Sequence, residues 1–254
     1  MSGSKRLLTF IGSFALFCIV YVWFFGVATA MVVEARYFGW KTPLLKKRPV
    51  ELTDSSISSA RGRKVTFSGY EFEVPWELDD DETKIVGTRQ VIVFRSGNAM
   101  LVMCAPPREF VNTVLKTFDK DNFQKMYGEE ALRSDYAMYR LMLRSTTDDV
   151  TLFTPRGEAV GRMMMLVVKG VAIPSEADTG LFSLRSREFK GFQYGDPQRR
   201  PTRIIVDLLA DEGGIEFNMG QKKDGSSPAI TQAEINRLIQ TTRRVPVLPS
   251  GANH

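Results

Sequence analysis

Residues 7–33 read LLTFIGSFALFCIVYVWFFGVATAMVV, and none of them carries a charge. An α-helix rises about 1.5 Å per residue, so this stretch could extend roughly 40 Å, more than the ~30 Å hydrocarbon core of a bilayer. The surplus length allows tilt or an interfacial end. The stretch therefore predicts a single transmembrane helix, preceded by a short basic leader at residues 1–6.

Two features beside this helix bear on its processing and orientation. Ala28-Thr29-Ala30 resembles a signal-peptide cleavage pattern, but a cleaved signal has an apolar region of only about 7 to 15 residues, so an uncleaved signal anchor is favoured. More basic residues follow the span than precede it, which favours a cytoplasmic domain. The charged leader favours an extracytoplasmic domain, as does the rule that long domains translocate largely regardless of charge. We therefore expect the domain on the extracytoplasmic side, and the cytoplasmic side is the alternative.

The basic character of the chain gathers next to the predicted span. The whole protein carries a net charge of +5, yet residues 1–48 hold seven basic residues and one acidic residue, so the remainder has a net charge of −1. A nucleic-acid partner is therefore not expected, because it requires a concentrated basic track. Basic residues beside a span are attracted to anionic headgroups, and aromatic residues favour the same interface. The predicted membrane-surface residues are Arg36, Tyr37, Trp40, Lys41, Lys46, Lys47 and Arg48.

Beyond the span the chain divides by composition. Residues 34–63 form a basic juxtamembrane segment and linker, since prolines interrupt it and residues 55–63 (SSISSARGR) are polar. Residues 64–245 form a globular domain, and residues 246–254 a loose tail. About 200 residues are enough for one domain with its own core.

Strand and helix patterns alternate within that domain. Hairpins are predicted at residues 64–74 and 90–104, helices at 108–118, 129–145 and 157–168, and strands at 181–194, 203–209 and 215–219, the last two paired as a hairpin. Thr231 and Glu234 form a capping box that opens a final helix. The predicted fold class is α+β, in which the N-terminal transmembrane helix is followed by an antiparallel sheet flanked by helices.

Few residues suited to catalysis are present. The only histidine is His254, so the domain lacks a histidine base, a Ser-His pair and a histidine metal site. Neither common phosphate-binding glycine loop occurs. Contiguous acidic residues at 79–82 lack the spacing of a calcium loop and predict a solvated loop. Cys18 and Cys104 do not suggest a disulfide framework. No catalytic residue, metal site or cofactor is predicted.

A second group of basic residues follows the later strands. These side chains would form an anion-binding or partner-binding face if adjacent strands brought them together, and otherwise they are outward-facing strand residues. The residues of this predicted face are Arg185, Arg187, Lys190, Arg199, Arg200 and Arg203.

The order of elements is similar to that of one known family. The resemblance is to the PsbP-like fold, and it lies in the early hairpins with the segment 70–76 (YEFEVPW), the middle helices, the late hairpin strand 204–208 (IIVDL) and the closing helix from 231–235 (TQAEI). That family includes photosystem oxygen-evolving enhancers and envelope proteins related to DcrB. The resemblance covers about residues 65–244 and rests on the order of elements rather than on a motif. It implies an antiparallel sheet flanked by helices and a non-enzymatic, assembly-assisting role.

The sequence therefore predicts a single-pass membrane-anchored, non-catalytic binding or assembly domain at a membrane surface. Its expected partners are the lipid bilayer and a protein of a membrane complex. One alternative is a carboxylate-dependent membrane-bound hydrolase or transferase, with a cleft between the sheet and the middle helices. Another is a domain that docks on anionic lipid through residues 36–48.

Overall fold

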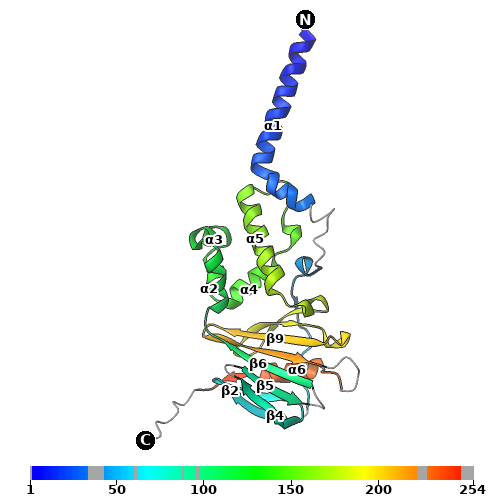
Figure 1. The fold of residues 1–254 in the computed structure, drawn as a ribbon, viewed down its shortest axis with the longest axis vertical. Helices are drawn as coiled ribbons and strands as arrows, with labels where there is room; N and C mark the ends of the chain where they lie inside the picture. Colours follow the sequence, from blue (N-terminus) through cyan, green and yellow to red (C-terminus); the bar gives the residue numbers. More distant parts are fainter. Residues whose placement is uncertain are drawn as a thin grey trace.

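The computed structural model of the chain describes residues 2–33, 43–59, 62–86, 89–94, 98–221 and 228–246. Figure 1 shows a long N-terminal helix that projects from the body, a group of helices next to it, and a sheet at the opposite end. The α-helices are α1 (Ser2–Val33), α2 (Glu109–Thr117), α3 (Lys120–Tyr127), α4 (Asp135–Arg144), α5 (Arg156–Ala172) and α6 (Gln232–Thr241). The 3₁₀ helices are η2 (Pro43–Lys46), η3 (Glu129–Leu132), η4 (Thr147–Asp149), η5 (Ser175–Asp178) and η6 (Pro197–Arg199).

The strands form two sheets. They are β1 (Val50–Glu51), β2 (Arg63–Phe67), β3 (Tyr70–Val74), β4 (Leu78–Val86), β5 (Arg89–Phe94), β6 (Asn98–Ala105), β7 (Leu181–Arg185), β8 (Lys190–Tyr194), β9 (Arg203–Ala210), β10 (Gly213–Gly220) and β11 (Arg243–Arg244). The larger sheet has the order β1-β7-β8-β9-β10-β6-β5-β4, and the smaller one has the order β11-β3-β2.

The larger sheet is mixed, which corrects the prediction of an antiparallel sheet. β1 pairs with β7 in parallel, and every other pairing along the sheet is antiparallel. The parallel pair arises because the segment predicted as a linker contains β1, and this segment runs along the edge of β7 in the same direction as β7. The coarser prediction of an α+β fold with a sheet flanked by helices is confirmed.

Strand β9 lies at the centre of the molecule because it is buried on both faces. Ile204 and Val206 belong to the core that the large sheet forms with the small sheet and α6, where Phe72 meets Phe217 at a ring distance of 5.0 Å. Ile205 belongs to the core on the opposite face, beneath α2 to α5. Successive side chains of a strand point to opposite faces, so a continuous apolar run is what a layer between two cores requires.

Most predicted elements are present. The hairpins β2–β3, β5–β6 and β9–β10 are confirmed, as are helices α2, α5 and α6, the last with its Thr231–Glu234 capping box. The run 181–194, predicted as one strand, is instead the hairpin β7–β8, closed by a bond from Ser186 N to Phe189 O of 2.8 Å. The helix predicted at 129–145 is divided into η3 and α4 by the N-cap residue Ser134.

Strand β4 and helix α3 are two further elements that the sequence did not predict. Residues 79–82 belong to β4, an edge strand of the large sheet, rather than to a loop. Charged residues suit an edge strand because they discourage pairing with another chain. Helix α3 is the other, and it begins where the Asp119 side chain accepts a bond from Asn122 N at 2.9 Å.

Residues 50–58 lie against the domain. β1 pairs with β7, Ser58 N donates to Ala233 O at 3.0 Å, and the Asn236 amide donates to the carbonyl oxygens of Asp54 and Ser56 at 2.8 and 2.9 Å. The segment predicted as a polar linker is therefore held along β7 and α6.

The C-terminal part of α1 also packs on the body. Ala28 is fully buried in a small core with Leu45, Val150, Ala159 and Leu166, the last two from α5. Figure 1 shows that α1 bends before it reaches this contact. Among the helices in the described part of the chain, none combines the length and the hydropathy of a bilayer-crossing segment.

Candidate functional site

Helix α4 forms one wall of a basic pocket. The Ser134 side chain caps the helix by accepting a bond from Ala137 N at 3.3 Å. The carboxylate of Asp135, in the first turn, accepts a bond from Val111 N of α2 at 2.9 Å, which fixes the start of the helix. Tyr136, Arg140 and Arg144 follow at intervals of four residues, and therefore project from one face.

The hairpin β7–β8 forms the opposite wall. Arg185 is the direct cross-strand partner of Lys190, and Ser183 is the partner of Phe192. Residues two apart on a strand share a face, so these four side chains point the same way. Two cations directly opposite each other on a sheet destabilise it. Both side chains are exposed, so solvent reduces this repulsion, and the pair adds two positive charges to this face of the hairpin.

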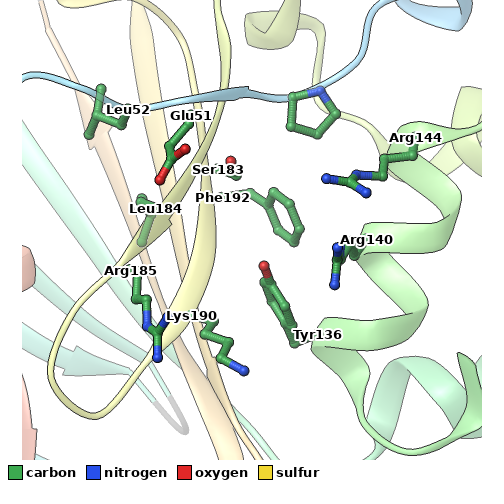
Figure 2. A pocket seen from close by; sticks show the side chains of 11 residues that line it. Glu51, Leu52, Tyr136, Arg140, Arg144, Ser183, Leu184, Arg185, Lys190 and Phe192 are labelled. Carbon is green, nitrogen blue, oxygen red and sulfur yellow. The ribbon is translucent and has the colours of Figure 1, made fainter. Parts of the chain in front are cut away.

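Together these walls enclose a cavity of about 430 Å³. Figure 2 shows Arg140 and Arg144 reaching from α4 towards the strands that carry Arg185 and Lys190, with the Tyr136 and Phe192 rings between them. Strand β1 contributes one carboxylate, Glu51, at the rim. The remaining lining residues are Pro49, Leu52, Ser183 and Leu184.

The charge of this pocket is not balanced within its own lining, although Arg140, Arg144 and Lys190 also line a neighbouring cavity that contains Glu130 and Asp211. Four cationic side chains face one carboxylate, and across the described residues no ion pair involves Arg140, Arg144, Arg185 or Lys190. The Lys190 ammonium lies 5.5 Å from the centre of the Tyr136 ring, and that ring stacks on Phe192 at 5.5 Å. An aromatic floor positions the cations, and arginine side chains bind carboxylate or phosphate groups in a two-pronged fashion.

The structure separates the six residues of the predicted anion-binding face. Arg185 and Lys190 come together in the pocket, whereas Arg187 is exposed in the turn between their strands. Arg203 forms a 2.8 Å ion pair with Glu176, and Arg199 lies 3.7 Å from Asp196.

The Arg203 pair keeps its carboxylate ionised. Burial opposes ionisation of Glu176, but the hydrogen bond and charge of Arg203 outweigh it and lower the pKa of that carboxyl. Arg200 is exposed next to this region and adopts a left-handed backbone conformation at φ 46°. Arg199, Arg200 and Arg203 are therefore not part of the pocket.

Arg140 and Arg144 line the pocket but were not among the site residues predicted from the sequence. In the sequence, arginines towards the end of the helix predicted at 129–145 also suit its C-terminus, where cations offset the helix dipole. Their spacing from Tyr136 was the available signal, because it places one aromatic and two cationic side chains on a single helix face.

The predicted membrane-surface residues fall into two groups. Arg36, Tyr37, Trp40 and Lys41 lie outside the described residues. Lys46 is exposed, Lys47 lies 3.7 Å from the Asp178 carboxylate, and Arg48 forms a 2.7 Å ion pair with Asp149. Lys47 and Arg48 thus connect the segment before β1 to the domain.

A buried lysine holds the walls of the pocket in place. Lys169 of α5 is fully buried, and its ammonium donates to the carbonyl oxygens of Lys47, Leu143 and Ser145 at 2.7, 2.9 and 2.7 Å. Burial lowers the pKa of Lys169 to about 8, assisted by the charge of Arg48. One side chain therefore joins the end of α4, which carries Arg144, to the segment that enters β1.

A pair of carboxylates lies on the helix-covered face of the sheet. Asp207 and Glu216 are direct partners across β9 and β10, and Tyr194 hydrogen-bonds to Asp207. Burial, together with the Glu216 charge, raises the pKa of Asp207 to about 8. Neither carboxylate lines the basic pocket or the four other cavities described for this structure. Within the described residues, no group of three or more potential metal ligands occurs.

Comparison of the chain with protein-family models, with curated proteins and with solved structures finds no match. The resemblance to the PsbP-like fold therefore stays a prediction, and the function is argued from the site.

Lys169→Met is expected to lower the free energy of unfolding by about 3 kcal/mol, because three buried carbonyl oxygens lose their donor. Urea unfolding of the full chain in mild detergent measures this change. Lys116→Met is the matched control, since Lys116 is exposed on α2 and should stay within about 0.5 kcal/mol of the parent. Equal effects of both substitutions would contradict the role of Lys169.

Asp207→Asn is expected to remove part of the pH dependence of stability. The folded state keeps this proton up to about pH 8, whereas an unfolded aspartate releases it near pH 4. The folded protein therefore holds the extra proton between these values, and its free energy of unfolding falls as the pH rises through that window.

Urea unfolding at pH 5 and pH 8 checks the prediction. The variant should be more stable than the parent at pH 8 by at least about 1 kcal/mol, with a smaller difference at pH 5. Asp211→Asn, in the exposed β9–β10 turn, should show no such change with pH. A difference between D207N and the parent that is the same at both pH values would refute the assignment.

Proposed function

We propose that this protein is a single-pass membrane-anchored, non-catalytic binding module whose basic pocket holds an acidic group of a protein partner. The observation that carries the proposal is the pocket itself, in which Arg140, Arg144, Arg185 and Lys190 converge without carboxylate partners among the described residues. Such a cluster opposes folding through mutual repulsion and gains stability when an anion enters.

The position of the pocket favours a protein partner over lipid of the anchoring membrane. Arg156, at the start of α5, lies 5.5 Å from the Trp23 ring of α1, whereas Lys169 near the end of α5 touches the end of α4. Thirteen residues of helix separate them, which corresponds to about 20 Å. The pocket is thus separated by about 20 Å of helix from the Trp23 part of α1, whereas the end of α1 comes closer, since Val32 lines a cavity with Lys46 and Thr147.

The anchor part of the proposal rests on the uncharged stretch at residues 7–33. Packing of α1 against the body supports an uncleaved anchor, because cleavage after Ala30 would remove Ala28 from the small core around Val150 and Phe25 from its contact with Phe153. The orientation stays as expected from the sequence, with the domain on the extracytoplasmic side and the cytoplasmic side as the alternative.

The alternative of a carboxylate-dependent enzyme has one observation in its favour. Asp207 and Glu216 are adjacent, and the pKa of Asp207 is raised to about 8, as in a general acid. A reaction also needs a cavity where substrate meets these groups, and neither of them lines the basic pocket. Binding without catalysis is therefore the better-supported proposal.

Anion binding is tested with the double variant Arg140→Ala/Lys190→Ala. A short polyglutamate peptide and inorganic phosphate serve as separate probes in calorimetric titrations of the full chain in detergent. The variant should bind polyglutamate at least about tenfold more weakly, because two charge-assisted hydrogen bonds are lost. The control Arg199→Ala/Arg200→Ala removes the same charge outside the pocket and should bind as the parent does.

The two probes separate the sources of the anion. Binding of polyglutamate that depends on the pocket supports a protein partner, whereas binding of phosphate alone would overturn that part of the proposal. Equal weakening by both double variants would indicate attraction by net charge and would overturn the site.

Membrane anchoring is tested by extraction of membranes at alkaline pH. The parent protein should stay with the membrane pellet, and Leu16→Arg/Val20→Arg should release it, since each charge within a span costs about 2.5–3.5 kcal/mol. Val167→Arg, exposed on α5, is the control and should remain in the pellet. Release of the parent protein itself would overturn the anchor.

A further inference from the structure

The exposure of α1 changes abruptly along its length. Among the side chains that the structure describes before Phe25, the large apolar ones are 46–66% exposed, and they are Leu16, Phe17, Ile19, Val20, Val22, Trp23 and Phe24. From Phe25 to Thr29 the side chains are buried or half-buried against the body. The change marks the level at which α1 meets the domain.

At the same level the body presents an apolar tip, formed by Leu152 and Phe153 in the turn before α5. Phe153 is 72% exposed and Leu152 is 41% exposed. The turn is tightly formed, because Thr151 N donates to Thr154 Oγ1 at 2.9 Å and Thr154 N donates to Thr151 O at 3.0 Å. The turn thus holds the Phe153 ring outside the body, on the side that meets α1.

The apolar tip is fastened to α1. The Tyr21 hydroxyl donates to Leu152 O at 3.1 Å, and the Phe153 ring meets the Tyr21 and Phe25 rings edge-on at 6.4 and 6.2 Å. The apolar tip therefore lies beside the exposed apolar surface of α1, and the two form one continuous patch.

Aromatic and basic side chains mark the boundary at this level. The Arg156 guanidinium lies 5.5 Å from the Trp23 ring, and tryptophan and arginine are typical of the membrane interface. Residues 7–24 would span about 27 Å as a helix, close to the ~30 Å hydrocarbon core. The part of the apolar stretch beyond Phe24, which exceeds that thickness, is the part that packs on the body.

We infer that the apolar tip inserts into the boundary between headgroups and acyl chains beside α1, so that the domain is docked directly on the bilayer. The inference rests on the proposed membrane anchor and adds a second membrane contact to it. Aromatic and leucine side chains that enter this boundary gain free energy through apolar burial.

Depth-dependent fluorescence quenching tests the inference in the full chain. The protein is reconstituted into phosphatidylcholine vesicles, with or without bromine on the acyl chain near the headgroup. All variants carry Trp40→Phe. One retains Trp23 as a marker of the anchor, and two others carry Trp23→Phe with either Phe153→Trp or Val171→Trp. Trp76 stays in every variant, since it is 3% exposed in the sheet core and gives a constant unquenched signal.

The control uses the most exposed apolar residue that lies far from the tip. Val171 is 84% exposed on α5, fifteen residues or about 22 Å beyond Arg156. Brominated lipid should reduce the emission added by F153W about twofold, and leave that added by V171W unchanged.

Each outcome bears on one part of the inference. Quenching of Trp23 without quenching of the F153W signal overturns the inserted tip, while the anchor stands. Such a tip would be covered by protein or water instead. Quenching of both the F153W and the V171W signals would mean that α5 lies flat on the membrane, and this result would also overturn the inserted tip. If Trp23 is not quenched either, the anchor itself fails.

Discussion

The arrangement of the helical layer depends on the buried ammonium of Lys169. It has no carboxylate partner among the described residues and is stabilised instead by three carbonyl oxygens from Lys47, Leu143 and Ser145. Burying a charge is costly unless every donor is satisfied, so the three acceptors have to stay where they are. In this way one side chain fixes the segment before β1, the end of α4 and the body of α5 against each other, and the two walls of the basic pocket inherit that geometry.

In the basic pocket, unlike at Lys169, cationic side chains lie near one another. Arg185 faces Lys190 directly across two strands, and two more arginines approach from α4. Natural sequences usually avoid such pairs, and departures from local rules concentrate at functional sites. Elsewhere on the described surface, cations of the same region such as Arg203 and Arg48 are paired with carboxylates. The two paired arginines hold segments of the fold together, whereas the four cations of the pocket have no ion pair among the described residues, as the proposed anion site requires.

The sequence predicted those elements whose determinants are local. Hairpins with alternating side chains and the Thr231–Glu234 capping box were recognisable because their signals lie within a few residues. Strand β4 was missed because its charges are poor strand signals, and its pairing is supplied by β5. Only Arg185 and Lys190 of the pocket were predicted, since the contribution of Arg140 and Arg144 depends on how α4 packs over β8, which is a tertiary property. The parallel pairing of β1 likewise required knowledge of where the linker residues run.

Between α1 and the pocket the described elements are joined by packing rather than by a flexible tether. Phe25 and Ala28 contact the body, α5 continues from that contact, and Lys169 completes the path to α4. In a bilayer, the body would therefore behave as a lever fixed to the anchor. A thinner or thicker membrane changes the tilt of a span, and a tilt of about 10° acting over roughly 20 Å would displace the pocket by about 3–4 Å. Membrane thickness would thus be converted into the position of the pocket relative to a partner.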